Sequence, residues 1–178
     1  EKCTTCNKDT IDELWIAKYN VPDNLNDTHT DVFVDTAGNV YVAGSSIGTN
    51  TKNDFVTIKY DPNGNQVWVA RYNGLDSLND TPADIFVDSA GNVYVTGSST
   101  VKYDPNGSQL WAINSIGERL TVDEAGNVYV AENFTVKKYD SNGNQIWVRS
   151  HNGLGYAQST AMTIDSAGDI YMTGITYN

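Results

Sequence analysis

The sequence predicts an all-β protein built from repeats, and three observations lead to that class. The unit D-x-x-G-[ND]-[VI]-Y-[VM] occurs four times along the chain. Asn, Gly, Thr, Ser and Tyr are abundant while charged residues make up only 19%, a composition that favours strands and tight turns over helices. The length of 178 residues and the hydrophobic fraction of 39% suit one compact domain. We therefore expect a single domain with little helix.

The spacing of the repeats indicates the architecture. The four copies are Asp35–Val42, Asp88–Val95, Asp123–Val130 and Asp165–Met172. Their successive spacings of 53, 35 and 42 residues lie in the range of propeller blades. A second unit alternates with the first, at Thr57–Trp68, Val101–Trp111 and Val136–Trp147. It combines a strand, a turn in which Gly supplies the positive φ, and a Trp-bearing strand, which is a hairpin pattern. The prediction is a β-propeller of four four-stranded blades.

Each blade can be assigned strand by strand. Strand one is the apolar run before the Asp, as in Ala83–Val87; strand two is the GNVYV segment; the hairpin supplies strands three and four. Val93 and Val95 fall on one face of strand two and Tyr94 on the other, so both faces carry bulk, as stacked blades need. One tryptophan recurs at the same position of every copy: Trp15, Trp68, Trp111 and Trp147. We interpret these rings as core between blades rather than as ligand platforms.

The repeat resembles the bacterial SBBP repeat family, whose blades carry IKYDPNGNQ-WVARYNG followed by A-x-x-VD-x-x-GNVYVTG. That pattern is Ile58–Gly74 followed by Ala83–Gly97 here, and shorter versions cover nearly all of residues 11–178. The resemblance implies an exported or cell-surface propeller, while the fold alone does not decide an activity. The expected organisation is a polar leader at 1–10 and one four-repeat propeller domain at 11–178.

One blade is expected to be divided between the two ends of the sequence. The hairpin unit is complete three times, whereas the Trp strand and the Asp-Gly unit each occur four times. The first Trp strand, Glu13–Tyr19, lacks a third strand before it, and the last repeat reaches only its second strand. We expect Glu13–Tyr19 to complete the last blade, either in the same chain or in a neighbouring subunit. Effective concentration favours the first arrangement, and the second would give an oligomer or a filament.

The net charge and the length of the apolar runs limit which partners and which location we expect. The formal net charge of −11 excludes the basic surface that nucleic acid needs. The apolar runs are far shorter than the roughly 20 residues that cross a bilayer, so we do not expect a membrane-spanning chain. A first residue Glu1 in place of Met is interpreted as a mature exported product, secreted or at the cell surface. In such a compartment Cys3 and Cys6 are expected to form a disulfide, with each other or with another chain.

No sequence pattern indicates a catalytic centre, and we predict that the protein is not an enzyme. His29 is expected in a polar loop, and His151 stands where Tyr19 and Tyr72 stand in other copies, which indicates a packing variant. The turn Asp61–Asn65 lacks the Gly and Glu spacing of an EF-hand and is interpreted as turn chemistry. Two acidic loops of parallel composition give calcium candidates, which are Asp23, Asp27, Asp76 and Asp80. No other cofactor is expected.

The leading functional hypothesis is a non-enzymatic extracellular structural or adhesive protein that binds copies of itself by strand complementation. The alternative is a monomeric propeller that recognises a cell-surface glycan or protein through its rim loops, Asp23–Asp31 and Asp76–Asp84.

Overall fold

The computed structural model describes residues 14–19, 27–47, 52–74, 79–151 and 156–177, and within these ranges the secondary structure is β-strand without helix. The strands are β1 (Asp27–Val34), β2 (Val40–Ile47), β3 (Asn53–Tyr60), β4 (Gln66–Tyr72), β5 (Pro82–Val87), β6 (Val93–Gly97), β7 (Thr100–Tyr103), β8 (Gln109–Ile113), β9 (Arg119–Val122), β10 (Val128–Glu132), β11 (Thr135–Tyr139), β12 (Gln145–Ser150), β13 (Tyr156–Ile164) and β14 (Ile170–Tyr177). The predicted all-β class is therefore correct.

The strands form three four-stranded sheets and one two-stranded sheet among the described residues. Each is an antiparallel meander in chain order, β1-β2-β3-β4, β5-β6-β7-β8, β9-β10-β11-β12 and β13-β14. The predicted assignment of strands one to four holds in the first three blades. The fourth blade has only strands one and two.

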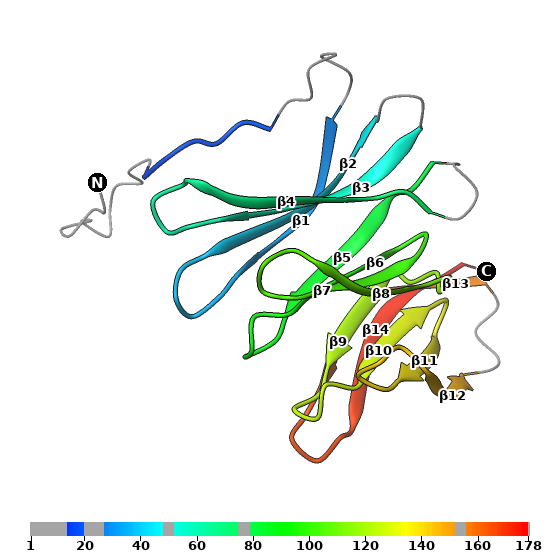
Figure 1. The fold of residues 1–178 in the computed structure, drawn as a ribbon. Coiled ribbons are helices and arrows are strands. Elements are labelled where there is room, and N and C mark those ends of the chain that lie inside the picture. The colour runs from blue at the N-terminus through cyan, green and yellow to red at the C-terminus, as the bar shows by residue number, and fades with distance from the viewer. Residues whose placement is uncertain (1–13, 20–26, 48–51, 75–78, 152–155, 178) are drawn as a thin grey trace, which may run out of the picture.

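The blades follow one another in a row that starts at the first sheet and ends at β13-β14 (Figure 1). Their first strands form the inner edge, because β1 packs on β5, β5 on β9, and β9 on β13. The core lies between neighbouring sheets. Tyr41 and Phe55 of the first blade pack against Val93, Val95 and other buried residues of the second. Tyr94 of the second blade packs in the same way on the third.

Asp side chains build the turns that separate the strands. Asp35 Oδ1 accepts hydrogen bonds from the N–H groups of Ala37 and Asn39 at 3.0 and 2.8 Å, and Gly38 adopts a φ of +83°. The hairpin turn repeats this arrangement, since Asp61 accepts from the side chain and the backbone of Asn65. Those hydrogen bonds, the one from the Asn65 side chain first, lower the pKa of Asp61. The carboxylate oxygens of these turns are thus used within the turn itself.

The expectation that Glu13–Tyr19 closes the last blade within the same chain is wrong in this structure. Its described part, residues 14–19, forms no strand and lies beside the first blade, at the end of the row opposite to β13-β14 (Figure 1). Trp15, Ala17 and Tyr19 pack against the β3 residues Val56, Ile58 and Tyr60. The segment stacks on a blade face because its alternating apolar side matches that face, and within the described residues no third strand follows β14 to which it could pair.

Two further expectations need correction. The predicted loop Asp23–Asp31 is a strand from Asp27 onward, so His29 lies on β1 rather than in a loop, and Asp84 of the second predicted loop lies on β5. Antiparallel pairing with β2 makes this stretch a strand despite its polarity, with a β-bulge between His29 and Asp31. None of the described segments is a helix long and apolar enough to span a membrane.

Candidate interaction faces

A group of four side chains recurs on three blades and defines the surface that each blade presents to the next. In the first blade the Tyr41 hydroxyl donates to Asp35 at 3.1 Å, the Trp68 ring lies 6.3 Å from the Tyr41 ring, and Lys59 Nζ lies 5.1 Å above it. The same set is found on the other two blades as Tyr94, Asp88, Trp111 and Lys102, and as Tyr129, Asp123, Trp147 and Lys138. Burial raises the pKa of Tyr41 to about 12, and the bond to Asp35 acts in the same direction. The tyrosine hydroxyl is therefore a fixed donor.

Two of these tryptophans, Trp68 and Trp111, also join their blade to the hairpin of the following one. The Trp68 indole N–H donates to the carbonyl of Pro105 at 3.0 Å, and the ring covers Gly107, whose φ is +84°. Trp111 makes the same joint with the carbonyl of Ser141 and with Gly143. The tryptophans are half-buried at these contacts between blades. Their position agrees with the interpretation as inter-blade packing.

The first blade carries an apolar face that no blade covers within the described residues. We call it the head face, and it consists of Val32, Val34, Val40 and Val42. Val32 and Val34 are 59% and 58% exposed. Their counterparts in the second blade, Ile85 and Val87, are 4% and 5% exposed because the first blade covers them. The head face is therefore a blade-stacking surface without its blade.

The last sheet carries the opposite surface, the tail face, which consists of Tyr171, Thr173 and Ile175 on β14. Tyr171 holds the repeat position of Tyr41 and donates in the same way to Asp165, at 3.2 Å. Its side chain is 56% exposed, whereas Tyr41 is 1% exposed under the second blade. The tail face is thus the surface that a further blade would cover.

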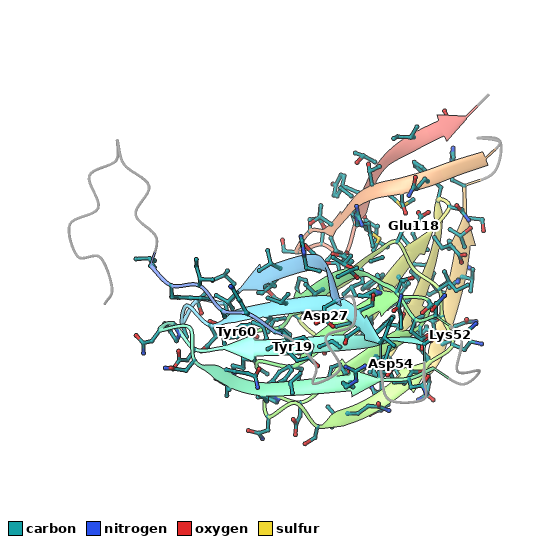
Figure 2. The ribbon with its side chains drawn as sticks, turned by 90° about the horizontal axis from the view of Figure 1, so that it is seen from above. Tyr19, Asp27, Lys52, Asp54, Tyr60 and Glu118 are labelled. Carbon is teal, nitrogen blue, oxygen red and sulfur yellow. The ribbon has the colours of Figure 1, made fainter. Side chains whose placement is uncertain are left out.

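A pocket of about 330 Å³ lies next to the head face, between segment 14–19 and strands β1 to β3. Trp15 and Tyr60 form one wall, with ring centroids 5.8 Å apart, and Tyr19 lies beside Tyr60 (Figure 2). Arg71 fastens the segment, since its guanidinium donates to the Tyr19 hydroxyl at 3.2 Å and to Asp54 at 3.1 Å. In the interface between the first and second blades, the corresponding space is filled by Tyr41, Ala43 and Phe55. The pocket is the space that strands two and three of a preceding blade would occupy.

A pair of carboxyl groups links the inner strands. Asp31 and Asp84 each follow a β-bulge at the same repeat position of β1 and β5. Asp31 accepts from the N–H of Ile85 at 3.1 Å, and Asp84 accepts from the N–H of Leu120 at 2.7 Å, so each reaches the next blade. Burial raises the pKa of Asp84 to about 7, and its hydrogen bond to Asp31 adds to the rise. A neighbouring carboxyl group disfavours the charged form of Asp84, so Asp84 keeps its proton to a higher pH than a free carboxyl group does.

The calcium hypothesis stays a prediction. Asp23 and Asp76 lie outside the described residues. Asp80 is buried, and its oxygens accept hydrogen bonds from the N–H of Gly74 and the hydroxyl of Ser98, at 2.6 and 3.0 Å. Asp27 stands at the start of β1, beside the pocket. In the described ranges no three His, Cys, Asp or Glu side chains are grouped for a metal.

The remaining predicted residues are not brought together. Cys3 and Cys6 lie outside the described residues, so their disulfide stays a prediction. His29 and His151 are exposed and stand on different blades, the first on β1 and the second just after β12. Sequence reasoning missed the Asp31–Asp84 pair. The signal available was an Asp four residues before the repeat Asp in the first two copies, but the bulge that turns both toward the next blade is not visible in the sequence.

The fold and its joints define a repeat protein of the β-propeller type, with a row of blades that is open at both ends. More closely, the sequence model of the SBBP family, described as "Beta-propeller repeat", matches residues 67–104, which confirms the SBBP resemblance and shows that the chain carries a repeat of this kind. No curated protein matches the chain.

Three solved structures share the fold. A protein of unknown function from Bacteroides caccae is 13% identical with a TM-score of 0.55, and the match covers 80% of this chain and 51% of that one. XC5397 from Xanthomonas campestris, a gluconolactonase, is 16% identical with a TM-score of 0.58, over 90% and 57% of the two chains. BamB from Moraxella catarrhalis is 16% identical with a TM-score of 0.51, over 92% and 55%. The chain therefore spans about half the length of the structures it matches.

Proposed function

We propose that this protein is a non-enzymatic extracellular structural module that associates with further copies of itself through its head and tail faces. The observation that supports the proposal is the contrast between Val32 and Val34 and their buried counterparts in the second blade. Burial of a Val or Ile side chain stabilises a contact by about 1.5–3 kcal/mol relative to exposure, so a face that leaves Val32 and Val34 exposed favours association. The two faces differ, and a contact between them is head-to-tail.

The chemistry of each face favours a blade of the same kind as partner. In the second and third blades, the surface that corresponds to the head face is covered by apolar side chains of the preceding blade, among them Tyr41 and Tyr94. The tail face presents the corresponding tyrosine. Association of head with tail thus repeats a contact that the protein already makes between its own blades.

Sedimentation velocity over a hundredfold range of protein concentration tests the proposal, with electron micrographs of the concentrated sample. We expect association that depends on concentration. Val34→Lys on the head face should abolish it without lowering the melting temperature. Leu110→Lys is the matched control, because Leu110 is equally exposed on a strand of the second blade, away from both faces. A chain that stays monomeric at every concentration would overturn the proposal.

An enzymatic function is the competing class, because a fold neighbour is a gluconolactonase and Asp31 and Asp84 are neighbouring carboxyl groups on the inner strands, where burial raises the pKa of Asp84. We assign the pair a structural role, since both carboxyl groups already accept backbone hydrogen bonds from the next blade. Hydrolysis of gluconolactone, with and without divalent cations, checks this assignment. Activity that disappears in Asp84→Asn, while the variant remains folded, would replace the structural proposal with an enzymatic one.

A further inference from the structure

Trp15 holds only half of the contacts that the other blade-joining tryptophans make. Trp68 lies 6.3 Å from Tyr41 of its own blade and 6.4 Å from Tyr103 of the next, and its ring covers Gly107. Trp15 has the contacts to the next blade, because it lies 5.8 Å from Tyr60 and its ring covers Gly64. Within the described residues it has no tyrosine that takes the place of Tyr41.

Tyr171 lacks the complementary contacts within the described residues. It keeps the hydrogen bond to Asp165 that every repeat tyrosine makes. In the described part of the chain it has neither the tryptophan that packs beside Tyr41, Tyr94 and Tyr129 nor the lysine above them. The side chain is 56% exposed as a result. One end of the row of blades thus has a tryptophan without its tyrosine, and the other end has a tyrosine without its tryptophan.

We infer that Trp15 of one copy packs beside Tyr171 of a second copy, so that the two ends together form one blade. The inference rests on the proposed self-association and names its contact. A second copy is the occupant because segment 14–19 and β14 lie at opposite ends of the row of blades in one chain (Figure 1). Residues before Leu14 and the third strand of this blade are not part of the inference.

In this arrangement β13-β14 of one copy covers the head face of the other. Tyr171 then stands over the valines of β1 and β2 as Tyr41 stands over Val93 and Val95 inside the chain. An aromatic pair stabilises a contact beyond the effect of the area that it buries. The rings also exclude water from the valine contact, so the pair and the apolar face act together.

Cross-linking between copies tests the contact directly. In a background with Cys3→Ser and Cys6→Ser, two single variants, Trp15→Cys and Tyr171→Cys, are mixed and treated with a short bis-maleimide. We expect a covalent heterodimer from the mixture. Leu14→Cys replaces Trp15→Cys in the matched control, because Leu14 is adjacent and exposed but points away from the first blade, and it should cross-link much less.

A second measurement keeps the native tryptophan. Tyr171→Ala should weaken association by about tenfold or more, as expected for the loss of about 1.4 kcal/mol, while leaving the melting temperature nearly unchanged because the side chain is exposed in the monomer. Leu110→Ala should leave association unchanged. Tyr171→Phe should retain most of the affinity because the ring is kept.

The outcomes separate the two proposals. If the chain associates but residues 15 and 171 do not cross-link and Tyr171→Ala binds normally, the Trp15–Tyr171 contact is wrong while self-association stands. If a chain carrying both cysteines cross-links within a monomer, the contact lies within one chain and the inference falls. If the unmodified chain does not associate at all, the proposed function falls with it.

Discussion

Asp84 Oδ2 accepts the backbone N–H of Leu120 at 2.7 Å, so the second blade holds the third through a carboxyl group whose pKa burial raises to about 7. Arg119 is the cationic group that faces it and opposes the rise, while Asp31 faces it from the first blade and adds to the rise. The charge state of this group therefore changes near neutral pH.

The raised pKa predicts that the protein is more stable at pH 5 than at pH 8. Between about pH 4 and pH 7 the folded chain keeps a proton on Asp84 that the unfolded chain has released, so the free energy of unfolding falls as the pH rises through this window. Melting temperatures by circular dichroism at half-unit steps from pH 4.5 to 8.5 measure it. Asp84→Asn should flatten the profile, since the amide keeps both hydrogen bonds without a charge. Glu124→Gln, at an exposed site, should leave the pH profile unchanged. A flat profile in the unmodified protein would contradict the prediction.

Two glycines with nearly the same backbone angle should respond differently to a methyl group. Gly107 and Gly168 have φ angles of +84° and +88°. A Cβ on Gly107 would lie 2.7 Å from the Trp68 ring, whereas a Cβ on Gly168 meets nothing within 4 Å. Gly168→Ala should cost about 1–2 kcal/mol for the left-handed backbone alone, and Gly107→Ala about 1–3 kcal/mol more for overpacking. Urea unfolding measures both, and equal losses would show that the tryptophan joint is loose.

Loss of one indole N–H should loosen one joint between blades. Trp111→Phe removes the indole hydrogen bond to the Ser141 carbonyl, while Lys102 Nζ still donates to that carbonyl at 3.3 Å. The change should therefore cost about 0.5–1.5 kcal/mol, the net value of one hydrogen bond. Hydrogen exchange should rise in the hairpin that contains Ser141 more than in the first blade. Trp147→Phe is the matched variant, since Trp147 packs on Tyr129 as Trp111 packs on Tyr94, but in the described residues no hairpin of strands three and four follows it. Similar losses from both variants would contradict the assigned role of the joint.

Arg71 should decide whether segment 14–19 stays on the first blade. Its guanidinium donates to Tyr19, to Asp54 and to the carbonyl of Ser46. Arg71→Gln should therefore expose Lys18 to trypsin, with cleavage several-fold faster than in the unmodified chain. Arg149→Gln controls for the loss of a charge, because Arg149 packs on Trp147 at the far end of the row. Unchanged cleavage at Lys18 would mean that the packing of Trp15 and Ala17 is sufficient to hold the segment.

The repeat made most of the blade architecture predictable, because Asp, Gly and Trp positions fix turns and strand order locally. Ala83–Val87 and the GNVYV segment were assigned to the strands that they form. The placement of Glu13–Tyr19 was not predictable in the same way, since an alternating segment fits either a sheet edge or a blade face. The head face was missed for a related reason. Val32 and Ile85 are equivalent in sequence, and only the presence or absence of a covering blade distinguishes their burial.

The tryptophan on the last strand of each blade has a consequence for how such chains change in length. Each repeat supplies a tryptophan ring that packs on the glycine turn of the next blade, and a glycine turn on which the tryptophan of the previous blade packs. A whole repeat therefore carries both residues that its contacts with the neighbouring blades need. Duplication or deletion of one unit in the gene leaves every remaining connection matched. Lineages can thus add or remove units without compensating substitutions, and the uneven spacings between copies lie in the strand lengths and the loops rather than in these connections.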